Sequence, residues 1–207
     1  MTAMLKIGFV DDENINHKDY ATRLKRHNVD LKLYEGDGTA QSIAEWIVRE
    51  DLRCLLIDYD LRKKYARNGT DIVFAINQLL PHFPCIMLTN YPEQSQGEKL
   101  VPRRLIWDRE KMNALDLTEI VEAFQNEAEV YQKRKETLLS QYEELIEKRN
   151  REKLTATEEE QLLFLHSLFS KYGETDDFPA QLLTTETNQK MDSIIERLTR
   201  LIDTKED

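Results

Sequence analysis

The chain has 207 residues, 33% of them charged, and a formal net charge of -10. This length can bury the core of one or two domains, and only six Gly and five Pro argue against a loop-rich or all-β protein. The excess acid lies in residues 114–207, which hold 12 of the 29 basic and 22 of the 39 acidic residues. An acidic surface repels phosphate backbones, so we expect no nucleic-acid partner.

The lengths of the apolar runs and the positions of the cysteines indicate the cellular compartment of the protein. Every apolar run is shorter than the ~18 residues that a membrane-spanning helix needs. Residues 1–10 lack the long apolar core of a signal peptide. Cys54 and Cys85 lie inside apolar, strand-like runs, which is typical of buried free thiols in a reducing compartment. We therefore expect a cytoplasmic protein with no membrane partner.

Apolar periodicity predicts strands that alternate with helices through residues 1–113. The predicted strands are 5–10, 31–34, 53–57, 85–88 and 105–107, and the predicted helices are 14–27, 39–50 and 69–80. The polar segment 91–102 predicts a short helix at most. Strands that alternate with helices pair in parallel through right-handed crossovers. The predicted fold class is therefore α/β, a five-stranded parallel doubly wound sheet.

Three of these strands end in side chains that can take part in chemistry. Asp11 and Asp12 follow the first strand, Asp58 and Asp60 follow the third, and Thr89 follows the fourth. The carboxyl ends of parallel strands meet at one edge of the sheet, where open α/β folds bind ligands. Clustered carboxylates need a counter-charge, and Mg²⁺ beside an aspartate and a hydroxyl group suits phosphoryl chemistry. The simpler alternative is that Asp58 and Asp60 only cap a turn.

With these motifs in this order, residues 4–113 resemble the receiver domain of two-component response regulators, a flavodoxin-like fold. The resemblance implies that Asp58 accepts a phosphoryl group and that the Thr89 hydroxyl holds a phosphoryl oxygen and reports phosphorylation to the neighbouring surface. It also implies a Mg²⁺ site formed by Asp12 directly, Asp11 largely through water, Asp58, and the backbone carbonyl of Asp60.

The sequence departs from the receiver pattern at the end of the fifth predicted strand. The family has a Lys there that pairs with the phosphoryl group, whereas this chain has Asp108, whose carboxylate would repel it. Arg109 and Lys111 are the nearby cations that could reach the site instead. Leu105 stands where the family has an aromatic switch residue, with Trp107 close by. These departures leave open a degenerate receiver that serves as a phosphorylation-independent interaction or dimerisation module.

A second resemblance points to another class of protein. Residues 58–60 (DYD) and 88–90 (LTN) look like parts of the haloacid-dehalogenase-like phosphatases, which are Mg²⁺-dependent and form an aspartyl-phosphate on the first Asp of a DxD pair. In those enzymes the DxD pair lies on the first strand and an acidic pair comes late, whereas here residues 11–12 come first. We therefore expect a phosphoacceptor regulator rather than an enzyme.

Residues 114–207 are predicted to form an all-α extension that begins with a long helix. Apolar residues from Leu117 to Leu145 recur at alternating spacings of four and three, a coiled-coil pattern with one polar interruption at Lys135. A helix of roughly 40 residues would be on the order of 60 Å long. Its apolar seam needs a partner, either the chain's own later helices or a second copy in a homodimer.

Two shorter amphipathic helices are predicted after the long one, at 155–172 and 185–203. Thr155 and Glu158 fit a capping box, and His166 lies in a leucine-rich helix as a packed histidine. The sequence thus predicts a receiver-like domain at 1–113 and a helical extension at 114–207. The predicted function is signal relay, in which a histidine kinase or related ATPase phosphorylates the receiver and the extension contacts a downstream protein.

Overall fold

A computed structural model describes residues 4–13 and 17–173 of the chain. The chain divides into two compact units, 1–134 and 135–207, so the division falls within one long helix, α6 (Thr118–Arg151). The last predicted helix, at 185–203, lies outside the described residues. Every helix in the described ranges is too short or too polar to cross a lipid bilayer.

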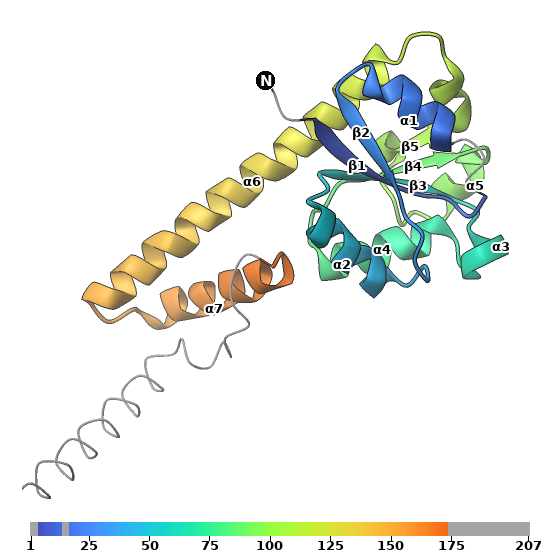
Figure 1. Cartoon of the computed structure of the whole chain (residues 1–207). Helices are drawn as coiled ribbons and strands as arrows, with labels where there is room; N and C mark the ends of the chain where they lie inside the picture. The colour runs from blue at the N-terminus through green and yellow to red at the C-terminus, as the bar shows by residue number, and fades with distance from the viewer. Residues whose placement is uncertain (1–3, 14–16, 174–207) are drawn as a thin grey trace, which may run out of the picture. The chain divides into compact units, whose positions relative to one another are not determined.

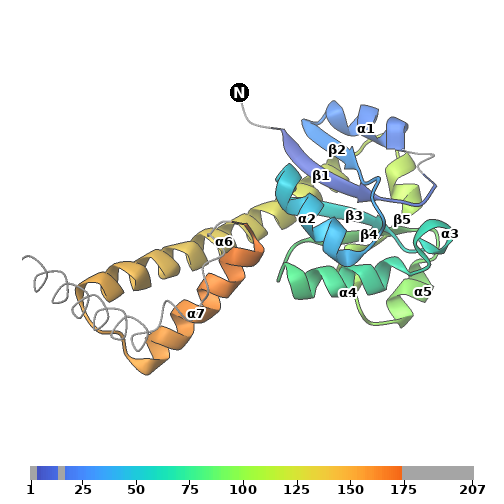
Figure 2. The ribbon, with the colours of Figure 1, turned by 60° about the horizontal axis from the view of Figure 1, so that its bottom comes forward.

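A five-stranded sheet forms the centre of the first unit (Figures 1 and 2). All four strand pairings are parallel, and the strand order is β2-β1-β3-β4-β5, which confirms the predicted sheet. The strands are β1 (Leu5–Val10), β2 (Val29–Leu33), β3 (Cys54–Asp58), β4 (Cys85–Thr89) and β5 (Ile106–Asp108). Cys54 to Ile57 are all completely buried, because helices cover β3 on both faces.

Helices lie on both faces of the sheet (Figure 2). In the first unit they are α1 (His17–Lys25), α2 (Ala40–Glu50), α3 (Arg62–Tyr65), α4 (Gly69–Leu79), α5 (Pro92–Gly97) and the start of α6, with 3₁₀ turns η1 (Arg103–Leu105) and η2 (Arg109–Asn113). No helix was predicted in the basic segment 62–67, where α3 forms a single turn. The short helix allowed in the polar segment 91–102 is α5, which begins at a Pro.

One apolar core joins α1, the sheet and the first turns of α6. Phe9 on β1 packs against Tyr20 on α1, with ring centroids 6.1 Å apart, and both side chains are buried. On the other side of this core, Phe124 on α6 stacks on Trp107 on β5 at 5.6 Å. Burying a side chain of this size contributes about 1.5–3 kcal/mol. This packing holds the strands whose carboxyl ends carry the candidate site.

In the second unit, the described residues form the end of α6 and α7 (Ala156–Lys171). The predicted capping box at Thr155 and Glu158 is present at the start of α7. His166 is buried, and its Nδ1 lies 3.0 Å from the hydroxyl of Tyr142 on α6. This is the packed histidine expected from the sequence. The apolar residues that α6 and α7 bury in this unit are Leu145, Leu162, Leu165, Leu168 and Phe169.

Candidate functional site

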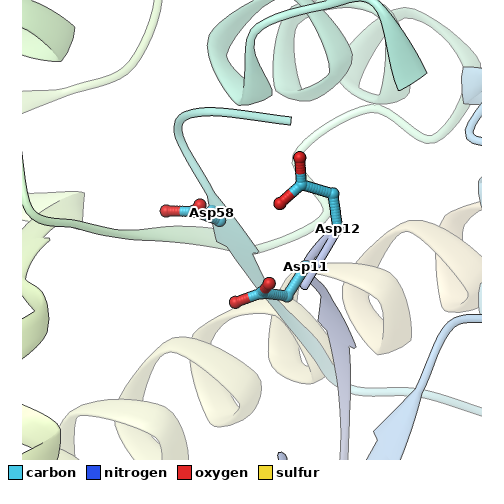
Figure 3. Close-up of side chains that lie close together, drawn as sticks. All are labelled: Asp11, Asp12 and Asp58. Carbon is cyan, nitrogen blue, oxygen red and sulfur yellow. The ribbon is translucent and has the colours of Figure 1, made fainter. Parts of the chain in front are cut away.

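Three carboxylates converge at the carboxyl edge of the sheet. β1 and β3 are neighbours in parallel register, with Val10 opposite Ile57. Asp11 therefore follows β1 beside Asp58, the last residue of β3. Carboxylate oxygens of Asp11, Asp12 and Asp58 all lie within 4.8 Å of one another, and Figure 3 shows the three side chains close together at the ends of their strands. The parallel topology thus brings together residues that lie 46 positions apart in the sequence (58 minus 12).

Burial makes negative charge costly in this cluster. Asp11 is only 2% exposed, and the side chain of Asp58 is 14% exposed. Desolvation, with the nearby charge of Asp11, raises the pKa of Asp58 to about 6, although Arg109 acts in the opposite direction. Desolvation also raises the pKa of Asp12, again helped by the charge of Asp11. Clustered carboxyl groups with raised pKa values are typical of a functional site that takes a cation.

Arg109 supplies the positive charge that the cluster contains. Its Nη1 lies 3.0 Å from Oδ2 of Asp11, and its Nη2 lies 2.8 Å from Oδ1 of Asp58. Burial alone would lower the pKa of Arg109, but the attraction of Asp58 and Asp11 outweighs it and the pKa is raised. The planar guanidinium can bridge two carboxylates because its donors point in fixed, divergent directions. Arg109 is therefore the cation that reaches the site.

Asp108 does not take the place in the site that the sequence pattern gave it. Its side chain is exposed, and its Oδ1 accepts a hydrogen bond from the backbone N–H of Glu110, 2.9 Å away, at the start of η2. Lys111 also lies elsewhere, with its Nζ over the ring of Trp107. β5 spans 106–108 rather than 105–107, so Asp108 is its last residue and caps η2, and Arg109 is the first residue beyond the strand. The expected repulsion from Asp108 is thereby removed.

Asp60 directs its side chain to Arg62 rather than to the carboxylate cluster. Both carboxylate oxygens accept hydrogen bonds from the guanidinium, at 2.8 and 2.9 Å. The hydrogen bonds from Arg62 lower the pKa of Asp60 to about 2. The backbone of Asp60 forms an isolated bridge with Asn68. Only the backbone carbonyl of Asp60 was predicted as a metal ligand, and that role stays a prediction.

Thr89 is fully buried at the end of β4, the strand next to β3. Asp58 is the register partner of Leu88, the residue before Thr89. Thr89 therefore lies one position beyond the level of Asp58, at the same edge of the sheet. The Thr89 hydroxyl oxygen accepts a hydrogen bond from the backbone N–H of Tyr91 at 2.9 Å. This bond leaves the hydroxyl proton free to be donated. The predicted contact of Thr89 with a phosphoryl oxygen stays a prediction.

Gly69 lets the start of α4 approach the backbone of Asp58. A Cβ atom at this position would lie 2.0 Å from the carbonyl oxygen of Asp58, which no real side chain can tolerate. The N–H of Gly69 also donates to the carbonyl of Tyr59 at 2.7 Å. The glycine is therefore required by close approach, and it fixes the loop that follows β3.

Two residues near the site were not predicted as functional. The backbone N–H of Lys63 donates to Oδ2 of Asp12 at 3.1 Å, and its side chain pairs with Glu13. The basic run at 62–64 and the acidic run at 11–13 are a signal that could have suggested this contact. Glu98 accepts hydrogen bonds from three side chains of the β3–α4 segment. It lies in a polar segment without periodicity, so no sequence signal indicated it.

Solved structures of similar fold include several receiver domains. The signal receiver domain of an HD-domain-containing protein from Pseudomonas fluorescens is 15% identical, with a TM-score of 0.51, over 66% of this chain and 95% of that chain. A response regulator receiver protein from Sinorhizobium medicae is 12% identical, with a TM-score of 0.47, over 62% of this chain and 97% of that chain. The RcsB response regulator of Salmonella typhimurium is 14% identical, with a TM-score of 0.48, over 85% of this chain and 95% of that chain.

No protein-family model matches the sequence, and a search of curated proteins found no match. At these low identities a structural likeness establishes the fold alone. The Pseudomonas domain and the β2-β1-β3-β4-β5 parallel sheet carry that assignment. The α/β unit of this chain therefore has the flavodoxin-like fold of response-regulator receiver domains, followed by a helical extension.

Proposed function

We propose that the protein is a signal-relay protein that accepts a phosphoryl group on Asp58. The observation that carries this proposal is the convergence of Asp11, Asp12 and Asp58 at the sheet edge, with Arg109 bound to two of them. In the reaction, an oxygen of the Asp58 carboxylate attacks the phosphorus of the donor. A new P–O bond forms while the bond from phosphorus to the leaving group of the donor breaks, and the leaving group departs with that electron pair.

The carboxylate cluster fits Mg²⁺ by the chemistry of its donors. Mg²⁺ prefers oxygen ligands and commonly takes one or two carboxylates together with phosphate oxygens and water. Asp11, Asp12, Asp58 and the backbone carbonyl of Asp60 would hold the ion. When bound, the ion would neutralise the carboxylates and the phosphoryl oxygens that meet at this edge.

Arg109 would orient Asp58 before transfer and hold the phosphoryl group after it. Its Nη2 donates to one oxygen of Asp58, which leaves the other oxygen for the attack. Its Nε is buried and has no hydrogen-bond partner among the described residues. A buried donor without a partner costs about 1–3 kcal/mol. A phosphoryl oxygen that accepted a hydrogen bond from this Nε would remove that cost. Arg109 would thus do the work of the Lys in the receiver pattern, and Thr89 would supply a second donor.

The partners follow from this assignment. A histidine kinase or related ATPase would phosphorylate the receiver-like domain, 1–113, in the cytoplasm. The acidic helical extension, 114–207, would carry the output through protein–protein contacts, either as a coiled-coil homodimer or with a downstream protein. The similar fold of the Pseudomonas signal receiver domain supports this role.

One observation favours the degenerate receiver as a second candidate. The guanidinium of Arg109 already bridges Asp11 and Asp58, so the site has an internal counter-charge without any metal ion. A site of this kind could persist as a structural element of an interaction module. The phosphatase alternative lacks comparable support, because Asp60 is held by Arg62 and its lowered pKa makes it a poor proton donor.

The mass of the intact protein after incubation with acetyl phosphate and Mg²⁺ tests the proposal. We expect a labile gain of one phosphoryl group in the wild type and none in Asp58→Ala. Asp71→Ala is a matched control, because Asp71 is an exposed Asp in the first turn of α4 and is not one of the clustered carboxylates, so the variant should keep the gain. A wild type that gains no mass and binds no Mg²⁺ would favour the degenerate receiver instead.

A further inference from the structure

Glu98, at the end of α5, binds three side chains of the segment that follows Asp58. Its Oε1 accepts hydrogen bonds from the hydroxyl of Tyr59 at 2.6 Å and from Nδ2 of Asn68 at 3.2 Å. Its Oε2 accepts a hydrogen bond from the hydroxyl of Thr70. One carboxylate thus joins α5 to both ends of the segment 59–70.

Two of the three donors in this network are buried, and Asn68 and Glu98 are partly exposed. Tyr59 is 8% exposed and Thr70 is completely buried. Burial would raise the pKa of Glu98, but the hydrogen bonds from Thr70, Tyr59 and Asn68 outweigh it and the pKa is lowered. The hydrogen bond to Glu98 also raises the pKa of Tyr59 to about 12. Glu98 is therefore ionised and its partners are protonated donors, so the hydrogen bonds are charge-assisted.

The three donors stand next to the residues that form the site. Tyr59 directly follows Asp58, and Asn68 is bridged through its backbone to Asp60. Thr70 follows Gly69, where an added Cβ would clash with the carbonyl oxygen of Asp58. A displacement of Asp58 or of the Asp60 backbone would therefore move at least two of the groups that Glu98 binds.

We propose that Glu98 is a positioning residue that fixes the 59–70 segment around Asp58 and couples the state of the site to the segment 92–105. This inference rests on the proposed function, because the site that Glu98 positions is the proposed Mg²⁺ and phosphoryl site. Coupling between two sites is reciprocal. If Glu98 helps the site to bind its ligand, ligand binding must in turn change the conformation or mobility of the segment 92–105. The segment 92–105 includes α5 and η1 and leads directly into β5 and Arg109.

The test uses the full chain and Mg²⁺ alone as the probe. Glu98→Gln removes the charge and weakens the hydrogen bonds, and Glu93→Gln is the matched control because it removes the same charge from an exposed position on α5. Calorimetric titration should show Mg²⁺ binding about tenfold weaker in Glu98→Gln and unchanged in Glu93→Gln, as for other residues that orient metal ligands. Tyr59→Phe, which removes one donor, should weaken binding in the same direction even if Glu98→Gln does not fold.

Hydrogen exchange of the same proteins separates coupling from a purely structural role. In the wild type and in Glu93→Gln, Mg²⁺ should slow amide exchange in 92–105, and in Glu98→Gln this slowing should be lost. Equal Mg²⁺ affinity and equal slowing in the wild type, Glu98→Gln and Tyr59→Phe would overturn the inference and leave the proposed function standing. A wild type that binds no Mg²⁺ would overturn the proposed metal-dependent function, and the inference with it.

Discussion

The Nη2 atom of Arg109 lies 2.8 Å from Oδ1 of Asp58, and the two side chains are only 12% and 14% exposed. The same guanidinium reaches Asp11 through Nη1. Arg109 therefore balances the charge of the two carboxylates that burial makes most costly. It also connects η2, which follows the short strand β5, to the ends of β1 and β3.

Removing Arg109 should destabilise the protein strongly in the absence of metal. Arg109→Ala leaves the buried carboxylates of Asp11 and Asp58 without their counter-charge, which typically costs about 3–5 kcal/mol. Urea unfolding in EDTA measures this loss. Added Mg²⁺ should restore more of the free energy of unfolding in Arg109→Ala than in the wild type, because the ion supplies the missing charge.

Arg104→Ala is the matched control for that experiment. Arg104 pairs with Glu127, but its side chain is 67% exposed, so its loss should change the free energy of unfolding by less than about 1 kcal/mol. Similar losses in Arg109→Ala and Arg104→Ala would show that Arg109 does not balance the buried cluster.

The pKa of Asp58 predicts a pH dependence of stability in metal-free protein. Its pKa is raised to about 6 from 3.8, so between these values the folded state binds more protons than the unfolded state. Folding stability therefore decreases as pH rises from about 4 to about 6, by on the order of 2–3 kcal/mol, and stays lower above that window.

The comparison of wild type with Asp58→Asn isolates this effect from the other carboxyl groups. Asn does not titrate, so the variant should gain stability relative to the wild type as pH rises through the window. Urea unfolding in EDTA at pH 4.5 and pH 7.5 checks this. If the stability difference between the two proteins were the same at both pH values, the raised pKa of Asp58 would be wrong.

Much of the fold and of the acidic cluster could be predicted because each depends on strong local signals. The run at 54–57 is apolar throughout, and strands that alternate with helices can pair in parallel in few ways. Once the strands are parallel, Asp11 and Asp58 must end at the same edge. The sequence left open whether Asp108, Arg109 or Lys111 reaches the site from the end of β5, because the strand has three residues and a shift of one residue exchanges Asp108 for Arg109. Glu98 could not be predicted because its partners lie 28 to 39 residues away.

Gly69 should be much less tolerant of a side chain than Gly97. A Cβ at Gly69 would lie 2.0 Å from the carbonyl oxygen of Asp58, whereas at Gly97 it would meet no described atom within 4 Å. Gly69→Ala must push α4 away from β3, and overpacking of this kind costs about 1–3 kcal/mol. Gly97→Ala should cost less than about 0.5 kcal/mol. Urea unfolding of both variants measures the difference, and equal stabilities would contradict the close approach at Gly69.

The carboxylate of Asp60 should be dispensable for phosphorylation. It binds Arg62 in an ion pair whose side chains are 31% and 66% exposed, so solvent screens the pair and it contributes little to stability. Asp60→Asn keeps the backbone carbonyl that we propose as a metal ligand. The variant should therefore gain one phosphoryl group from acetyl phosphate and Mg²⁺ to the same extent as the wild type, as intact mass would show. Loss of the gain in Asp60→Asn, with stability unchanged, would mean that the Asp60 side chain takes part in the chemistry, as the second Asp of a DxD phosphatase does.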